Sequence, residues 1–137
     1  MKTLAQLIAE HGIRMTCEYA DRNPNMSTDG DWHLSASHWK CTFRNKAGRR
    51  MTCYFSQGSA HVGEPKLSSV LDCLASDAAG IDNARGFEDW VSEYGYDTDS
   101  RKAERTYKVC EAQYAKLRQF MGSEYAFKEL LFGVERE

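Results

Sequence analysis

Histidines and cysteines are the residues of this 137-residue chain that could bind a transition metal. Imidazole and thiolate groups are the ligands that zinc prefers, and five such residues are candidates: His33, His38, Cys41, Cys53 and His61. No CxxC pair or other tight chelating spacing occurs among them. Sequence alternation also places both cysteines on the opposite side of a strand from His38. The pattern therefore predicts buried thiols and surface histidines, with no metal site.

The cysteines are also poor candidates for a catalytic nucleophile. A reactive thiol must be partly exposed beside a group that lowers its pKa, whereas all five cysteines stand among apolar or strand-pattern residues. Asp97 and Asp99 match the start of a calcium loop, but Arg101 occupies the next ligand position and the following glycine is missing. The chain has no glycine-rich nucleotide loop. We therefore expect neither an enzyme nor a bound cofactor.

Negative charge distinguishes one stretch of the chain. Residues 71–100 hold eight carboxylates and one cation, a net charge of −7, although the whole chain carries only −2. Such a surface could occupy a basic, nucleic-acid-binding groove of another protein, with aromatic side chains as anchors. The candidate partner-binding residues are Asp72, Asp77, Glu88, Asp89, Trp90, Glu93, Tyr96, Asp97 and Asp99. The alternative is a solvated pair of acidic helices whose aromatic residues lie in the core.

Positive charge gathers in the first half of the chain, on strands that alternate polar and apolar residues. These cations could neutralise the phosphates of a nucleic acid, with one tyrosine available for stacking. The candidate residues are Arg14, Lys40, Arg44, Lys46, Arg49, Arg50 and Tyr54. A typical RNA-binding sheet carries several aromatic residues on its central strands, so a polar sheet face kept soluble by charge is the alternative. A third possibility combines the two surfaces in one assembly.

Polar and apolar residues that alternate with a period of two predict the strands that must position these residues. A first strand begins at Ile13, and an antiparallel hairpin joins His38–Asn45 to Arg49–Gln57 through a turn at residues 45–48. One face of the hairpin is apolar and is expected to be core: Trp39, Cys41, Phe43, Met51, Cys53 and Phe55. The opposite face carries the cations and is expected to contact water.

Apolar residues at steps of three and four predict five helices. The first is capped by Thr3 and ends at Gly12. The others run from Ser68 or Ser69 to near Gly80, from Asp82 or Asn83 to Gly95, from Ser100 to Met121 with Thr98 or Asp99 as cap, and from Glu124 to Phe132. We therefore expect an α+β fold in which a three-stranded antiparallel sheet packs against an N-terminal helix and a C-terminal helical half.

Composition indicates one soluble domain spanning residues 1–137. A hydrophobic fraction of 42% and a charged fraction of 28% are typical of a globular protein, and this length is enough to bury one core. No apolar run approaches the roughly 20 residues that span a bilayer, and the first residues do not form a signal peptide. We expect a cytoplasmic protein with free thiols and no membrane partner.

Four segments resemble a group of small phage and prophage accessory proteins. They are RNPNM (22–26), HWKCTFRNKAGRRMTCYFSQGSAH (38–61), VLDCLASDAAGIDNARGFEDW (70–90) and YGYDTDSRKAERTYK (94–108). Such accessory proteins include inhibitors of host defence, for example anti-CRISPR proteins. The resemblance therefore implies a stoichiometric inhibitor in the host cytoplasm that binds a defence protein or ribonucleoprotein complex, such as a CRISPR effector, through its acidic surface. The alternative is a small nucleic-acid-binding accessory protein that uses its basic sheet face.

Overall fold

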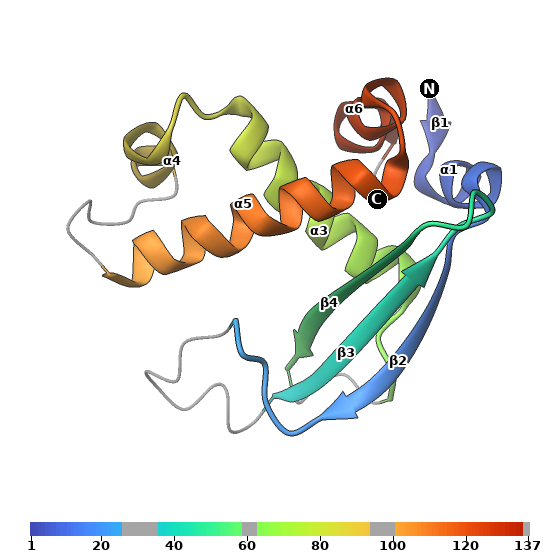
Figure 1. Ribbon diagram of the computed structural model, residues 1–137, viewed down its shortest axis with the longest axis horizontal. Helices are drawn as coiled ribbons and strands as arrows, with labels where there is room; N and C mark the ends of the chain where they lie inside the picture. Colours follow the sequence, from blue (N-terminus) through green and yellow to red (C-terminus); the bar gives the residue numbers. More distant parts are fainter. Residues whose placement is uncertain (26–35, 59–62, 94–100, 136–137) are drawn as a thin grey trace.

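A three-stranded sheet and a group of helices make up the protein, seen here in a computed structural model that describes residues 1–25, 36–58, 63–93 and 101–135 (Figure 1). The antiparallel sheet has the strand order β2-β3-β4. Its strands are β2 (Arg14–Ala20), β3 (Ser37–Arg44) and β4 (Arg50–Gln57). The described helices are α1 (Leu4–His11), α3 (Leu67–Asn83), α4 (Phe87–Glu93), α5 (Arg101–Met121) and α6 (Glu124–Phe132). The predicted α+β class, with an N-terminal helix and a C-terminal helical half, is confirmed.

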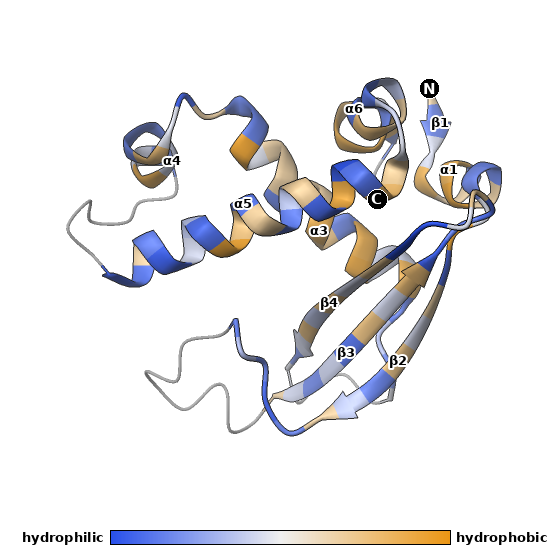
Figure 2. Ribbon diagram, viewed as in Figure 1, coloured by the Kyte–Doolittle hydropathy of each residue, from blue (hydrophilic) through white to orange (hydrophobic). Residues whose placement is uncertain are grey.

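The two faces of the sheet differ in polarity, as the alternation predicts. Figure 2 shows this alternation as bands of contrasting hydropathy along the strands. Phe43 and Cys41 of β3 are fully buried, and Met51 and Cys53 of β4 are nearly so. The ring of Phe43 meets that of Phe120 from α5 edge to face, with 6.2 Å between centroids. The core therefore lies between the apolar face of the sheet and the helices, and the predicted strand phase is confirmed.

The first helix begins and ends where the sequence predicts. The hydroxyl of Thr3 accepts a hydrogen bond from the Gln6 N–H, and the Gln6 side chain accepts one from the Thr3 N–H, which forms a capping box. Gly12 ends the helix with a φ of 59°, a conformation that glycine adopts readily. Just before α1, β1 (Lys2–Thr3) pairs in parallel with β5 (Val134–Glu135). This pairing was not predicted, because strands of two residues leave no periodic pattern.

A second, smaller core cluster lies between α4 and the N-terminal half of α5. It contains Trp90, Val91, Ala103 and Cys110. The rings of Phe87 and Trp90 both meet that of Tyr107 edge to face, at centroid distances of 5.3 and 5.2 Å. Aromatic contacts therefore hold α4 against α5.

The start of α3 differs from the prediction. The helix begins at Leu67, one or two residues before the serines proposed as caps, so the predicted caps Ser68 and Ser69 are wrong. Lys66 holds the N-cap position, and its side chain makes no capping hydrogen bond. Burial of Val70, Leu71 and Leu74 instead accounts for the position of the helix.

The end of α3 and the start of α4 also lie elsewhere than predicted. α3 continues through Gly80 to Asn83, and Asp82 in its last turn is held by side chains of α5 and α6. Both predicted caps of the next helix, Asp82 and Asn83, lie within α3, so this prediction is wrong. α4 begins at Phe87, and Asp89 accepts a hydrogen bond from the backbone N–H of Arg85. The helix end predicted at Gly95 and the cap predicted at Thr98 or Asp99 lie outside the described residues.

The last two helices agree closely with the prediction. α5 buries Ala103, Cys110, Leu117 and Met121, which recur along one side of the helix. α6 is capped by the hydroxyl of Ser123, which accepts a hydrogen bond from the Ala126 N–H. Among the described residues, no helix is long and apolar enough to cross a membrane.

Candidate nucleic-acid interface

Three arginines from three strands form a row across the open face of the sheet. Arg44 lies directly opposite Arg14 on one side and Arg50 on the other. All three side chains are exposed. Directly opposed side chains in antiparallel strands have Cβ atoms roughly 4.5–5.5 Å apart, so the row concentrates positive charge. Within the described part of the chain, none of the three forms an ion pair.

The rows beyond the arginines are polar but carry little net charge. The next row consists of Thr16, Thr42 and Thr52, and the third of Glu18, Lys40 and Tyr54. The carboxylate of Glu18 offsets the charge of Lys40 opposite it. Positive charge on this face is therefore greatest at the end of the sheet nearest the β3–β4 turn.

A second group of cations lies along α5. Arg101, Arg105, Lys108 and Lys116 line an open groove of about 500 Å³, together with Asn25 from the segment after β2. Their spacing places them on one side of the helix, away from its buried residues. Lys108 is paired with Glu104 at 3.4 Å. Of the residues described, no carboxylate pairs with Arg101, Arg105 or Lys116.

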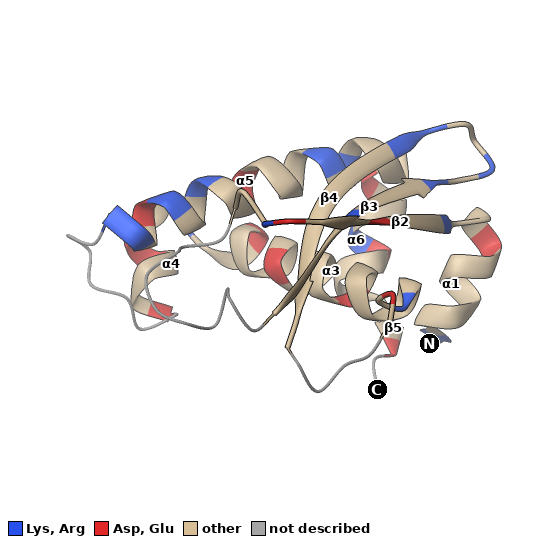
Figure 3. Ribbon diagram, turned by 90° about the horizontal axis from the view of Figure 1, so that it is seen from below, with Lys and Arg blue, Asp and Glu red and all other residues tan. Residues whose placement is uncertain are grey.

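Lys116 joins the two groups of cations. It also lines a groove of about 460 Å³ beside the edge strand β4, where Arg49, Arg50 and Gln119 are its neighbours. Figure 3 shows the cations following one long side of the molecule, from the start of α5 to the β3–β4 hairpin. We call the following set the basic surface: Arg14, Arg44, Arg49, Arg50, Arg101, Arg105 and Lys116.

Close packing fixes the hairpin end of the basic surface. The guanidinium of Arg49 lies against Gly122, where an added Cβ would come within 2.4 Å of Nη1. Gly122 has a φ of +85°, a backbone conformation that disfavours a side chain at this position. Lys46 is exposed at the tip but packs against Gly12, and its N–H donates to the carbonyl of His11. Lys46 therefore lies beside the basic surface, on its α1 side.

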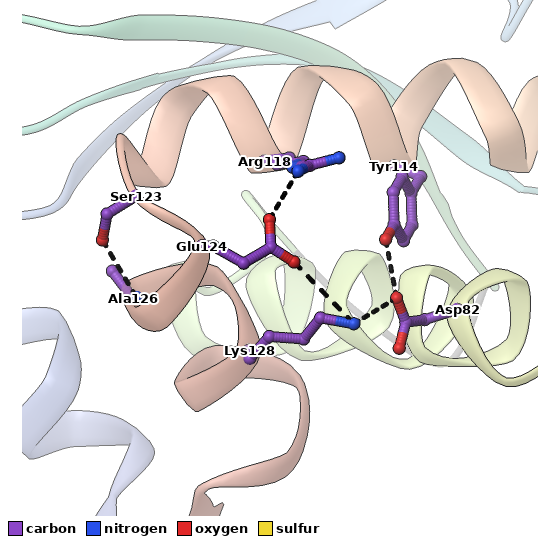
Figure 4. A network of polar contacts seen from close by, with 7 residues as sticks. All are labelled: Asp82, Tyr114, Arg118, Ser123, Glu124, Ala126 and Lys128. Carbon is purple, nitrogen blue, oxygen red and sulfur yellow. Dashed lines mark hydrogen bonds and ion pairs between the residues drawn. The ribbon is translucent and has the colours of Figure 1, made fainter.

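A network of polar contacts holds α5 in place against α3 and α6 (Figure 4). The hydroxyl of Tyr114 donates to the carboxylate of Asp82 at 2.6 Å, and Lys128 contacts the same oxygen at 2.5 Å. Glu124 pairs with Arg118 at 2.6 Å and lies 3.9 Å from Lys128. Because Arg118 and Lys128 are matched by carboxylates, neither contributes to the basic surface.

The same contacts shift the pKa values of two groups. Burial raises the pKa of Tyr114 to about 12, and the hydrogen bond to Asp82 adds to this effect. Burial alone would raise the pKa of Asp82, but the hydrogen bonds from Lys128 and Tyr114 outweigh it and lower the pKa. At neutral pH a carboxylate therefore accepts from a neutral phenol and an ammonium. This arrangement acts as a cross-link between three helices.

The predicted acidic surface is only partly available to a partner. Asp77, Glu88, Asp89 and Glu93 are exposed, whereas Asp72 is half-buried. Tyr96, Asp97 and Asp99 lie outside the described residues. Trp90 is only 3% exposed and belongs to the second core cluster, so its predicted role as a surface anchor is wrong. The physical reason is that the apolar side of α4 is buried against α5.

The residues considered for a zinc site are separated by the sheet. Cys17, Cys41 and Cys53 lie opposite one another on the core side, with 3.8 Å between the Sγ atoms of Cys17 and Cys41. His38 is on the opposite side of β3, where its Nδ1 lies 2.8 Å from the Ser56 hydroxyl. Its side chain is only 5% exposed, so the prediction of a surface histidine is wrong at this position. Burial raises the pKa of Cys17 to about 12, which disfavours the nucleophilic thiolate. Cys73 of α3 is exposed, contrary to the expectation of buried thiols, although partial burial and the carboxylates of Asp77 and Asp72 raise its pKa as well. His33 and His61 lie outside the described residues.

One cluster within the described segments has donor groups suited to a metal. Ligand atoms of Glu10, His11 and Glu129 lie within 4.8 Å of one another. The ammonium of Lys2 contacts the carboxylate of Glu10 and lies 3.1 Å from that of Glu129. A cation of the chain itself thus already neutralises this cluster, which links β1, α1 and α6.

The cations of α5 were missed as candidate binding residues by the sequence analysis. A signal was present, because Arg101, Arg105 and Lys108 recur at steps of four and three within a helix that was predicted correctly. Their proximity to the hairpin depends on how α5 packs beside β4, which no local pattern reveals.

Comparisons of the chain with protein-family models, with curated proteins and with solved structures each found no match.

Proposed function

We propose that the protein binds nucleic acid through the basic surface, by neutralising phosphates. The observation that carries this proposal is the continuity of seven cations across four elements, β2, β3, β4 and α5, and the segment leading into β4. In the described chain, none of these cations is matched by a carboxylate in an ion pair. A net negative chain can bind a polyanion, because the local charge at the contact decides the interaction.

The row of arginines favours the binding of a negatively charged ligand. Like charges placed directly opposite in a sheet destabilise it, and Arg44 has such a neighbour on both sides. Phosphates inserted between the guanidinium groups would remove that repulsion and provide acceptors for bidentate hydrogen bonds. Binding would therefore stabilise a feature that is unfavourable in the isolated domain.

Three double variants test this proposal. Arg44→Gln/Arg50→Gln removes charge from the sheet, and Arg105→Gln/Lys116→Gln removes it from α5. Lys66→Gln/Arg85→Gln is the matched control, since these exposed cations line neither groove of the basic surface. Affinity for a labelled DNA duplex is measured by fluorescence anisotropy over a salt series.

Both basic-surface variants are expected to bind more weakly than the control. In each of them, the slope of log affinity against log salt should become shallower by about 2, because two cations that neutralise phosphates have been removed. Equal affinities and slopes for all three variants would contradict the proposal.

A second candidate function is inhibition of a host defence protein through the acidic surface, as the phage resemblance implies. The exposure of Asp77, Glu88 and Glu93 favours it. It lacks the Trp90 anchor, and Asp89 is engaged with the backbone of Arg85. Glu88→Lys/Glu93→Lys is therefore the appropriate charge reversal. If this variant loses inhibition of a defence system while Arg105→Gln/Lys116→Gln retains it, the second candidate replaces the first.

A further inference from the structure

We propose further that the ligand of the basic surface is the backbone of double-stranded nucleic acid, bound in preference to single strands. This inference rests on the proposed function and names its substrate class. Three features of the surface support this inference: its described residues include no exposed aromatic side chain, its groups of cations match the dimensions of a duplex, and its donor groups suit phosphates.

In the described part of the chain, the basic surface has none of the exposed aromatic side chains on which single-stranded ligands are stacked. Proteins that bind single strands without sequence preference combine a positive groove with aromatic platforms, and each stacked base contributes about 1–3 kcal/mol. Among the described residues, the large aromatic side chains classed as exposed are Tyr19, Tyr125 and Phe132, and none lines either basic groove. Phe120 lines one groove but is only 2% exposed. The described residues that line these grooves therefore offer contacts to phosphates rather than platforms for stacked bases.

A surface that contacts only phosphates is expected to bind a duplex more tightly than a single strand, because more counterions are released. Duplex DNA carries one negative charge per roughly 1.7 Å of axis, and each neutralised phosphate contributes about 0.9 to the salt slope, against about 0.7 for a single strand. For the same set of contacts, counterion release is therefore greater on the duplex. Without stacking to offset this difference, the duplex is the favoured ligand.

The length of the basic surface suits about one turn of a duplex. Arg101 and Lys116 are fifteen residues apart on α5, which corresponds to about 22 Å along the helix axis. The row from Arg50 to Arg14 crosses two strand spacings, or about 10 Å. The two spans follow different directions, and each is shorter than the roughly 34 Å of one helical turn of DNA, so each can lie along a single turn.

The donor groups of the basic surface also suit the sugar–phosphate backbone. Six of its seven cations are arginines, whose planar guanidinium can donate two hydrogen bonds to one phosphate. The hydroxyls of Thr16, Thr42 and Thr52 form the adjoining row, and such hydroxyls are common partners of phosphate oxygens. We therefore expect little dependence on base sequence.

The test compares duplexes with single strands of the same length. Full-length protein is titrated into labelled DNA and RNA duplexes and into their separated strands, by anisotropy over a salt series. We expect at least one duplex to bind more tightly than any single strand. Its salt slope should be about −6 if nearly all seven cations reach phosphates. Duplexes of unrelated sequence should bind alike, and Tyr54→Leu, which removes the ring on the sheet face, should leave every affinity unchanged.

Two results would overturn this inference and leave the proposed function standing. The first is tighter binding of a single strand than of either duplex. The second is a marked loss of affinity in Tyr54→Leu, which would indicate base stacking. Binding of no probe at low salt would instead overturn the proposed function itself, and the inference with it.

Discussion

Arg44 lies directly opposite Arg50 in the antiparallel pair of β3 and β4, and both side chains are exposed. Opposed like charges destabilise a sheet, so this pair is unfavourable for folding in the absence of a ligand. Substitution of this pair should therefore weaken ligand binding without lowering the stability of the fold.

Arg44→Gln/Arg50→Gln is expected to weaken binding without weakening the fold. Because it removes a repulsion, the free energy of unfolding should stay the same or rise by about 0.2–1 kcal/mol. Urea unfolding measures this effect, and anisotropy measures the accompanying loss of affinity. A clear fall in stability would show that the two arginines support the fold, contrary to this account.

Phe43 is expected to be one of the most sensitive positions in the protein. It is fully buried against Phe120, so Phe43→Ala should cost about 3–5 kcal/mol of unfolding free energy through lost burial and a residual cavity. Arg44→Ala, one residue along the strand, should cost little. Equal effects in urea unfolding would mean that the faces of β3 are assigned in reverse, because a slip of one residue exchanges them.

The network around Asp82 is expected to make stability depend on acid pH. Its carboxyl has a lowered pKa in the folded protein, so its stabilising contribution is present above the unfolded pKa, about 3.9 for Asp, and is lost as the pH falls through the folded value. Asp82→Asn should lower the melting temperature at neutral pH and flatten its decline below about pH 4.

Melting curves from neutral to acid pH measure this effect, with Glu88→Gln as a control that removes an exposed carboxylate from α4. If Asp82→Asn and the control had the same pH profile, the contacts with Tyr114 and Lys128 would contribute nothing to folding.

The fold was largely predictable from the sequence because its main elements are periodic. Alternation in the hairpin identifies Phe43 as core and Arg44 as exposed, and the structure agrees. Capping signals identify Thr3 and Gly12 as the ends of α1, but Ser68 and Ser69 are not caps, although both are residue types that favour the N-cap. Here tertiary burial, rather than local capping, determines where α3 begins.

The candidate site was less predictable because it depends on contacts between distant segments. The arginines of the sheet were identified from strand phase, yet their continuity with Lys116 requires α5 to pack beside β4. Trp90 has the type and spacing of either a core residue or a binding anchor. The contact between Trp90 of α4 and Tyr107 of α5 shows that it is a core residue.

The purified protein is expected to contain no stoichiometric zinc. Cys41 and Cys53 lie on the core side of the sheet and His38 on the other, so these three groups cannot converge on one ion while the sheet is intact. Elemental analysis should find less than one equivalent, and the melting temperature should not change in chelator. One equivalent of zinc that resists dialysis would contradict this prediction.

The proposal that nucleic acid binds at the basic surface can be tested by changing the charge of that surface and of the acidic one separately. The most direct measurement is the affinity for a DNA duplex of Arg105→Gln/Lys116→Gln and Glu88→Gln/Glu93→Gln, determined side by side at the same salt concentration. The first variant is expected to bind more weakly than the unmodified protein, and the second at least as tightly, because it removes two carboxylates. Unchanged affinity in the first variant, or a loss confined to the second, would mean that the duplex does not bind at the basic surface.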